Sequence, residues 1–117
     1  MKVLSLADVP REPATLPGCL TATVGFLAGA TGAQDLSVDL MSIAAGGFVP
    51  SHPGRRDQTC TVVSGSGWAS GADGVWIPIG PGDTLVWPVG EDRGWRSDVG
   101  LTMLSIRAHG LLSQPES

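Results

Sequence analysis

Long apolar runs are missing from this sequence of 117 residues. No stretch of about 18 consecutive apolar residues is present, which excludes an ordinary transmembrane helix. The first residues, MKVLSLADVPREP, also lack the apolar core of a secretory signal peptide. The sequence therefore predicts a cytoplasmic protein with no membrane partner.

Cysteine and basic residues are scarce, and tyrosine is absent. Two cysteines, Cys19 and Cys60, cannot build the disulfide framework of a small secreted domain, so reduced thiols are expected. Lysine and arginine number 7 against 11 acidic residues, which gives a net charge of −4. Because the sequence has no basic stripe, nucleic acids and anionic membranes are poor partners.

Glycine and proline, by contrast, are abundant, with 17 and 9 residues, while 42% of the chain is apolar and can fill a core. Short apolar runs bounded by turn residues predict an all-β fold of many short strands, without long helices. The strands are expected near residues 2–5, 20–28, 36–44, 48–52, 58–64, 67–70, 74–79, 83–88, 93–97 and 99–107.

The length predicts a single domain without internal repeats or linkers. We expect an N-terminal arm over residues 1–18, a β-barrel over residues 19–108 and a frayed C-terminal tail over residues 109–117.

Two segments of the sequence are the most informative about its fold. Residues 46–65 read GGFVPSHPGRRDQTCTVVSG, and residues 82–97 read GDTLVWPVGEDRGWRS. Both resemble the two signature motifs of the cupin superfamily, whose turn-forming glycines and proline match here without a gap. The matching turn residues are Gly46, Gly65, Gly82, Pro88 and Gly90. This resemblance implies a double-stranded β-helix, a small cupin jelly roll, over about residues 36–107.

The positions that hold metal ligands in cupins are occupied here by His52, Gly54, Gln58 and Arg93. Glycine offers no donor, an amide oxygen is a weak donor, and a guanidinium has no lone pair and repels a cation. The resemblance therefore implies a cupin without a metal and without another cofactor. The alternative is a metal held by His52, Gln58 and a displaced His109.

In cupins these positions face one cavity, so His52, Gln58 and Arg93 are predicted as the catalytic residues. His52 would move a proton, while Arg93 and Gln58 would stabilise a developing oxyanion. Alternation along the strands turns further side chains inward. The substrate-binding residues expected from this pattern are Trp95, Cys60, Val62 and Ser97, with Arg55 at the cavity mouth.

The orientation of Arg93 stays open at this point. Turned inward, its guanidinium is available to a carboxylate, phosphate or enolate oxygen. Turned outward, it forms a surface ion pair with a neighbour such as Glu91 or Asp92.

The leading hypothesis is a metal-independent enzyme that acts on a small, partly apolar carbonyl or polyketide-like substrate. The reaction would be a proton transfer, in a cyclisation, isomerisation or dehydration such as secondary metabolism uses. The alternative is a non-catalytic cupin that binds or senses a small ligand. The resemblance, together with apolar outer positions such as Thr61, Val63 and Trp76, also predicts a homodimer.

Overall fold

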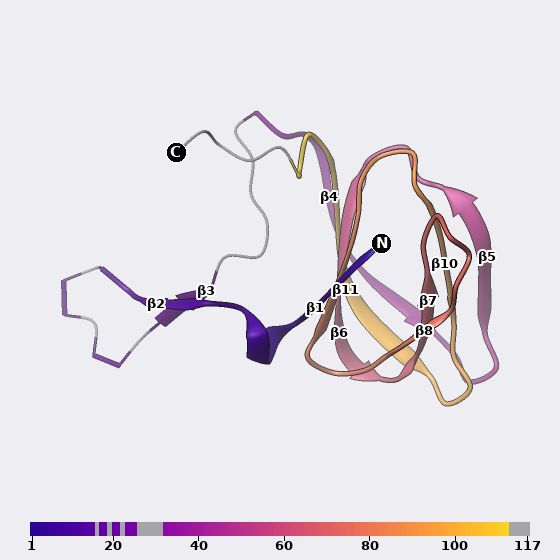
Figure 1. Cartoon of the computed structure of the whole chain (residues 1–117), viewed down its shortest axis with the longest axis horizontal. Helices are drawn as coiled ribbons and strands as arrows, with labels where there is room; N and C mark the ends of the chain where they lie inside the picture. Colours follow the sequence, from indigo (N-terminus) through magenta and orange to yellow (C-terminus); the bar gives the residue numbers. More distant parts are fainter. Residues whose placement is uncertain (16, 19, 22, 26–31, 113–117) are drawn as a thin grey trace.

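The computed structural model describes residues 1–15, 17–18, 20–21, 23–25 and 32–112. Two antiparallel sheets face each other and enclose a common interior (Figure 1). The described residues form no α-helix, only the short 3-10 turn η1 (Leu6–Asp8). The predicted all-β fold is confirmed. Within these ranges no helix is long and apolar enough to cross a membrane, and the cytoplasmic location stays a prediction.

The larger sheet has five strands in the order β1-β9-β6-β11-β4. Its central strands alternate as their sequences require: in β11, Leu101 and Met103 are buried, whereas Leu104 faces outward. The strand bounds are β1 Lys2–Ser5, β9 Asp83–Trp87, β6 Asp57–Gly65, β11 Leu101–His109 and β4 Gln34–Ile43.

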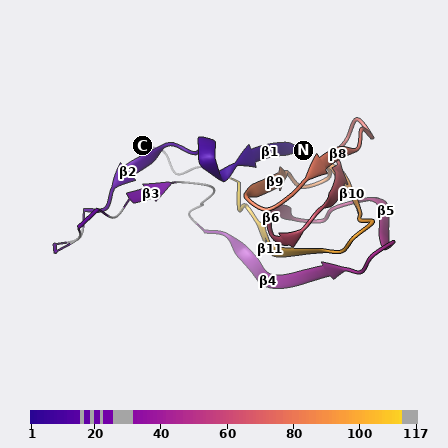
Figure 2. The same cartoon turned by 90° about the horizontal axis from the view of Figure 1, so that it is seen from below.

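The smaller sheet has four strands in the order β5-β10-β7-β8 and covers the open side of the larger one (Figure 2). The motif glycines serve the tight turns between strands. Gly65 and Gly90 have φ values of 77° and 86°, a left-handed conformation that glycine adopts without strain. The strand bounds are β5 Phe48–Pro53, β10 Asp92–Arg96, β7 Gly67–Ser70 and β8 Ile77–Ile79.

A separate two-stranded ribbon leaves the barrel on the side of β1 (Figures 1 and 2). It pairs β2 (Arg11–Pro13) with β3 (Thr23–Gly25). The strand predicted at 20–28 is therefore present as β3 in this ribbon, while residues 22 and 26–28 lie outside the described residues, as does Cys19. The barrel is built from β1 and the strands from β4 onward.

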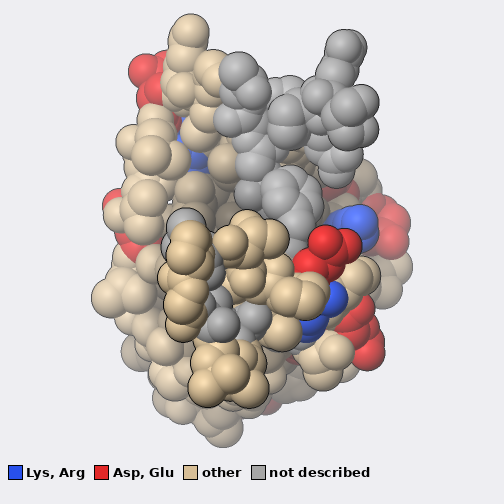
Figure 3. All heavy atoms as spheres, turned by 90° about the vertical axis from the view of Figure 1, so that its left-hand side faces the viewer, with Lys and Arg blue, Asp and Glu red and all other residues tan. Residues whose placement is uncertain are grey.

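Figure 3 views the molecule from the side of this ribbon. Acidic and basic side chains lie scattered, mostly along the margins of this face. The described residues visible there form no continuous basic surface, and the predicted absence of a nucleic-acid partner stays a prediction.

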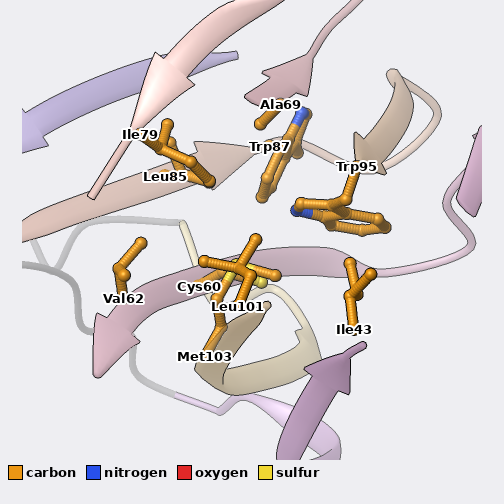
Figure 4. Close-up of a cluster of buried hydrophobic side chains, with 10 residues drawn as sticks. All are labelled: Ile43, Cys60, Val62, Ala69, Ile79, Leu85, Trp87, Trp95, Leu101 and Met103. Atoms are coloured by element: carbon orange, nitrogen blue, oxygen red, sulfur yellow. The ribbon is translucent and has the colours of Figure 1, made fainter. Parts of the chain in front are cut away.

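The core lies between the two sheets, where aromatic and aliphatic side chains meet (Figure 4). Trp87 and Trp95 contact each other edge to face, with ring centroids 5.2 Å apart and planes at 72°. Such aromatic pairs add about 1 kcal/mol beyond their area burial. Leu85, Met103 and Cys60 are fully buried beside them. This cluster fills the space between the two sheets around β6, β9, β10 and β11.

The outer face of the larger sheet exposes an apolar row. Leu36, Val38 and Leu40 alternate along β4, and Leu104 of β11 is the register partner of Leu40. Leu40 is 70% exposed. The predicted homodimer stays a prediction.

Candidate functional site

His52 lies on β5, directly opposite Arg93 of β10. Its Nδ1 atom is 2.9 Å from the carbonyl oxygen of Pro50. A carbonyl can only accept, so in the neutral ring Nδ1 carries the proton and Nε2 keeps its lone pair. The ring is exposed and tilted against Trp95, with centroids 6.0 Å apart. The fold therefore orients a histidine whose Nε2 is available as a base.

Arg93 points inward and is only 1% exposed. Nε donates to the Glu91 carbonyl at 3.1 Å, and Nη2 donates to the Pro88 carbonyl at 2.9 Å. Nη1 donates both to the Arg56 carbonyl at 3.2 Å and to Gln58 Oε1 at 3.0 Å. The guanidinium thus ties the turns on both sides of the cavity together through four hydrogen bonds.

No carboxylate forms an ion pair with Arg93 among the described residues. The cation is held by neutral oxygens, and burial lowers the pKa of its guanidinium from the ordinary value. An arginine nevertheless stays protonated at ordinary pH. The cavity wall therefore contains a buried positive charge that is not cancelled by direct contact.

Gly54 makes room for this arrangement. A Cβ built on Gly54 would overlap the guanidinium of Arg93, with no other group between them. The arginine side chain thus fills the space that a side chain at position 54 would otherwise occupy. The absence of a side chain at position 54 therefore leaves the room that the guanidinium of Arg93 needs.

A metal does not fit these residues. Of the four corresponding positions only His52 carries a good donor, and the cation of Arg93 occupies the space between them. Within the described part of the chain, no group of three or more His, Cys, Asp and Glu side chains is placed to hold a metal ion. The alternative set with His109 is not assembled, since His109 instead lies 3.5 Å from Asp35 and is exposed.

Gln58 is fixed at both ends of its amide. Its Oε1 atom accepts the hydrogen bond from Arg93, and its Nε2 donates to Ser105 Oγ at 2.8 Å and weakly to Cys60 Sγ at 3.6 Å. The side chain is buried. Gln58 therefore holds Arg93 in place and links it to the neighbouring strand β11.

A cavity of about 280 Å³ opens at this end of the barrel, and we call it the mouth cavity. Four of the seven Lys and Arg residues of the chain line it, in a protein whose net charge is −4. None of its lining residues is acidic. The lining residues are His52, Pro53, Gly54, Arg55, Arg56, Gln58, Arg93 and Arg107.

A second cavity of about 440 Å³, the inner cavity, shares His52, Gln58 and Arg107 with the mouth cavity. Its other walls are more apolar than those of the mouth cavity. They are formed by Asp39, Met41, Val49, Trp95 and Ser105, together with Leu40, which is itself largely exposed. Because three residues border both cavities, the two adjoin each other. Both are open to solvent, and the mouth cavity has the more cationic lining while the inner cavity has the more apolar one.

The structure brings five of the predicted site residues together: His52, Gln58 and Arg93, with Arg55 at the mouth and Trp95 in the inner wall. It places the other three elsewhere: Cys60, Val62 and Ser97 border neither cavity. Cys60 and Val62 are core residues, and burial raises the pKa of the Cys60 thiol to about 12. Ser97 donates to the Ser66 carbonyl at the opposite end of the barrel.

Several lining residues were not predicted from the sequence. Met41 and Asp39 come from β4, and Ser105 and Arg107 from β11, outside the two motifs. The available signal was the alternation of Met103, Ser105 and Arg107 on one face of β11. Only the register, in which Arg107 pairs with Gln58, places that face beside the motif residues.

The comparisons with known proteins bear on the fold of this chain. No family model matches the sequence, and no curated protein matches it. Among solved structures, a cupin superfamily protein from Desulfitobacterium hafniense is similar at 23% identity, with a TM-score of 0.59, over 71% of this chain and 76% of that one. A protein with a double-stranded β-helix domain from Klebsiella pneumoniae is similar at 23% identity and a TM-score of 0.59, over 71% and 73%.

Structures with this fold include enzymes. The lyase DddQ from Ruegeria pomeroyi, described as a DMSP lyase, is 20% identical, with a TM-score of 0.59, over 62% of this chain but only 38% of its own. At such identities the similarity establishes the fold and not the activity. Together with the two facing antiparallel sheets, it shows that this chain has the double-stranded β-helix fold of the cupin superfamily.

Proposed function

We propose that this protein is a metal-independent enzyme of cupin fold that transfers a proton on a small, partly apolar carbonyl or polyketide-like substrate. The reaction class is cyclisation, isomerisation or dehydration. The observation that supports it most directly is the position of His52. Its ring is oriented by the Pro50 carbonyl and borders both the mouth cavity and the inner cavity.

In this proposal Nε2 of His52 takes a proton from the carbon next to the substrate carbonyl. The electron pair of the broken C–H bond moves into the carbonyl group and forms an enolate. The imidazolium then returns the proton to carbon or oxygen, which completes an isomerisation, or to a leaving hydroxyl, which completes a dehydration. His52 is neutral again at the end of the cycle.

Arg93 supports this step mainly through its charge. Four of its five N–H positions already have acceptors in the protein. A fixed cation in a poorly solvated wall still stabilises negative charge that develops in the cavity. Gln58 then acts as a positioning residue, because its amide oxygen holds the guanidinium.

One observation favours the alternative, a cupin that binds or senses a ligand without turnover. Proton-transfer enzymes often use an acid opposite the base. Among the described residues that line the two cavities, the only carboxyl group is Asp39, which Arg107 holds at 2.8 Å. A lone histidine can bind a ligand as well as move a proton.

Hydrogen–deuterium exchange separates these two functions without knowledge of the natural product. The protein is incubated in D₂O with 2-oxooctanoate or 2-octanone, and loss of the proton signal next to the carbonyl is followed by NMR. We expect exchange faster than in buffer, and an unchanged rate after treatment with EDTA. Exchange at the buffer rate with both compounds would favour the binding module instead.

A further inference from the structure

We infer that the ligand is an amphipathic carboxylic acid, with its carboxylate in the mouth cavity and its apolar body in the inner cavity. This inference names the substrate class of the proposed function and rests on the same site. It depends on three features of the structure: the charge of the mouth, the donors there that have no partner, and the apolar walls of the adjoining inner cavity.

The charge of the mouth is strongly one-sided. Arg55, Arg56, Arg93 and Arg107 line it without a lining carboxylate. Arg93 and Arg56 donate to neutral oxygens, the latter to the Asp35 carbonyl and to Ser37 Oγ. Of these four arginines, only Arg107 has an ion pair with a described residue, namely Asp39. The positive charge in excess there favours an anion over a neutral ligand.

Two arginines at the mouth have donors without a partner among the described residues. Arg55 is exposed, and the described part of the chain offers it no ion pair. The Nε atom of Arg107 is buried and has no hydrogen-bond partner, although Nη2 of the same group binds Asp39. A buried donor without a partner is unusual in a folded protein. A carboxylate oxygen between these two side chains would satisfy it after a rotation of the Arg107 side chain that exposes Nε to the cavity.

The walls of the adjoining inner cavity suit an apolar body. Met41 and Val49 line the inner cavity together with Trp95, which is 2% exposed. Small inorganic anions would leave this volume of about 440 Å³ unused. An alkyl chain or ring attached to the carboxylate would fill it, which distinguishes an amphipathic acid from free phosphate.

The test is a calorimetric titration of the full chain with octanoate, 1-octanol, acetate and inorganic phosphate. Octanoate has both features, whereas each of the others lacks one of them. We expect octanoate to bind at least about tenfold more tightly than each of the other three. Replacing Arg55→Gln or Arg107→Gln should weaken octanoate by about fivefold or more, with little change for octanol.

Arg96→Gln is the matched control, because it removes the same charge from an arginine that stacks on Trp68 and Trp76 away from the site. It should leave octanoate affinity unchanged. Octanol or phosphate binding as tightly as octanoate, no octanoate binding at all, or equal losses in the control and the mouth variants would each overturn the inference.

Failure of this inference can be told from failure of the proposed function. If octanoate binds as expected and no carbonyl compound exchanges its protons, the site binds acids without catalysis and the inference stands. If the neutral 2-octanone exchanges as fast as 2-oxooctanoate and octanoate does not bind, proton transfer stands and the acid assignment is wrong.

Discussion

Replacing Gly54 with alanine should lower the free energy of unfolding by about 3 kcal/mol. The new Cβ would occupy the place of the Arg93 guanidinium, which is buried and held by four hydrogen bonds. The side chain cannot move aside without leaving acceptors such as Gln58 Oε1, and buried partners of a charged group are costly to leave unpaired. Urea denaturation followed by tryptophan fluorescence measures this loss.

Gly80→Ala is the matched control. A Cβ at Gly80 meets no atom within 4 Å, and its backbone does not need a left-handed conformation. Its stability should change by less than about 1 kcal/mol. In addition, Gly54→Ala should cost much less in a chain that already carries Arg93→Ala, since the clash is then absent. Equal effects of Gly54→Ala and Gly80→Ala would show that the guanidinium does not lie against Gly54.

Replacing His52 with alanine should slow the proton exchange of 2-oxooctanoate by about 100-fold or more, because the only oriented base of the site is removed. The free energy of unfolding should change little, since the ring is exposed and makes one hydrogen bond, to Pro50. Octanoate should still bind. NMR exchange rates, a urea melt and calorimetry on the same preparation separate these effects.

The chain has one other histidine, His109, which provides the control for this variant. It lies at the end of β11, is 52% exposed and approaches Asp35 rather than the cavities. His109→Ala should exchange protons at the rate of the unmodified protein. The catalytic role of His52 is ruled out by a His52→Ala protein with undiminished exchange, or by equal losses in both variants.

The fold could be predicted because the glycines that form its turns stand at the spacing of the two motifs. Gly65, Gly82 and Gly90 all adopt a left-handed backbone that the motif spacing marks. The ribbon of β2 and β3 could not be foreseen, since a short apolar run does not tell which strand it pairs with. Residues 23–25 read as part of the barrel but pair with β2 instead.

Within the site, strand alternation correctly predicted which side chains point into the barrel. It did not predict which of them reach the cavity and which lie in the core. Gln58 lines the mouth, whereas Cys60 and Val62, two and four residues further along β6, enter the core. Each step of two residues advances about 6.6 Å along a strand, which is enough to leave a small cavity. In the same way Arg93 lies at the mouth, but Ser97 lies beyond the end of β10.

Arg107, by contrast, is a residue of the site that the sequence did not predict. No motif marks it, and its place beside Gln58 follows from the register of β11 with β6. Register depends on packing between strands that are distant in sequence, and the residue types of the two strands alone do not determine it.

The metal content of the purified protein tests the central claim most directly, namely that Arg93 stands at a position where the cupin motif carries a metal ligand. The untagged chain is produced in cells supplied with iron, manganese, nickel and zinc, and its metals are measured by elemental mass spectrometry. The account predicts far less than one metal ion per chain. One tightly bound ion per chain that disappears in His52→Ala would contradict it.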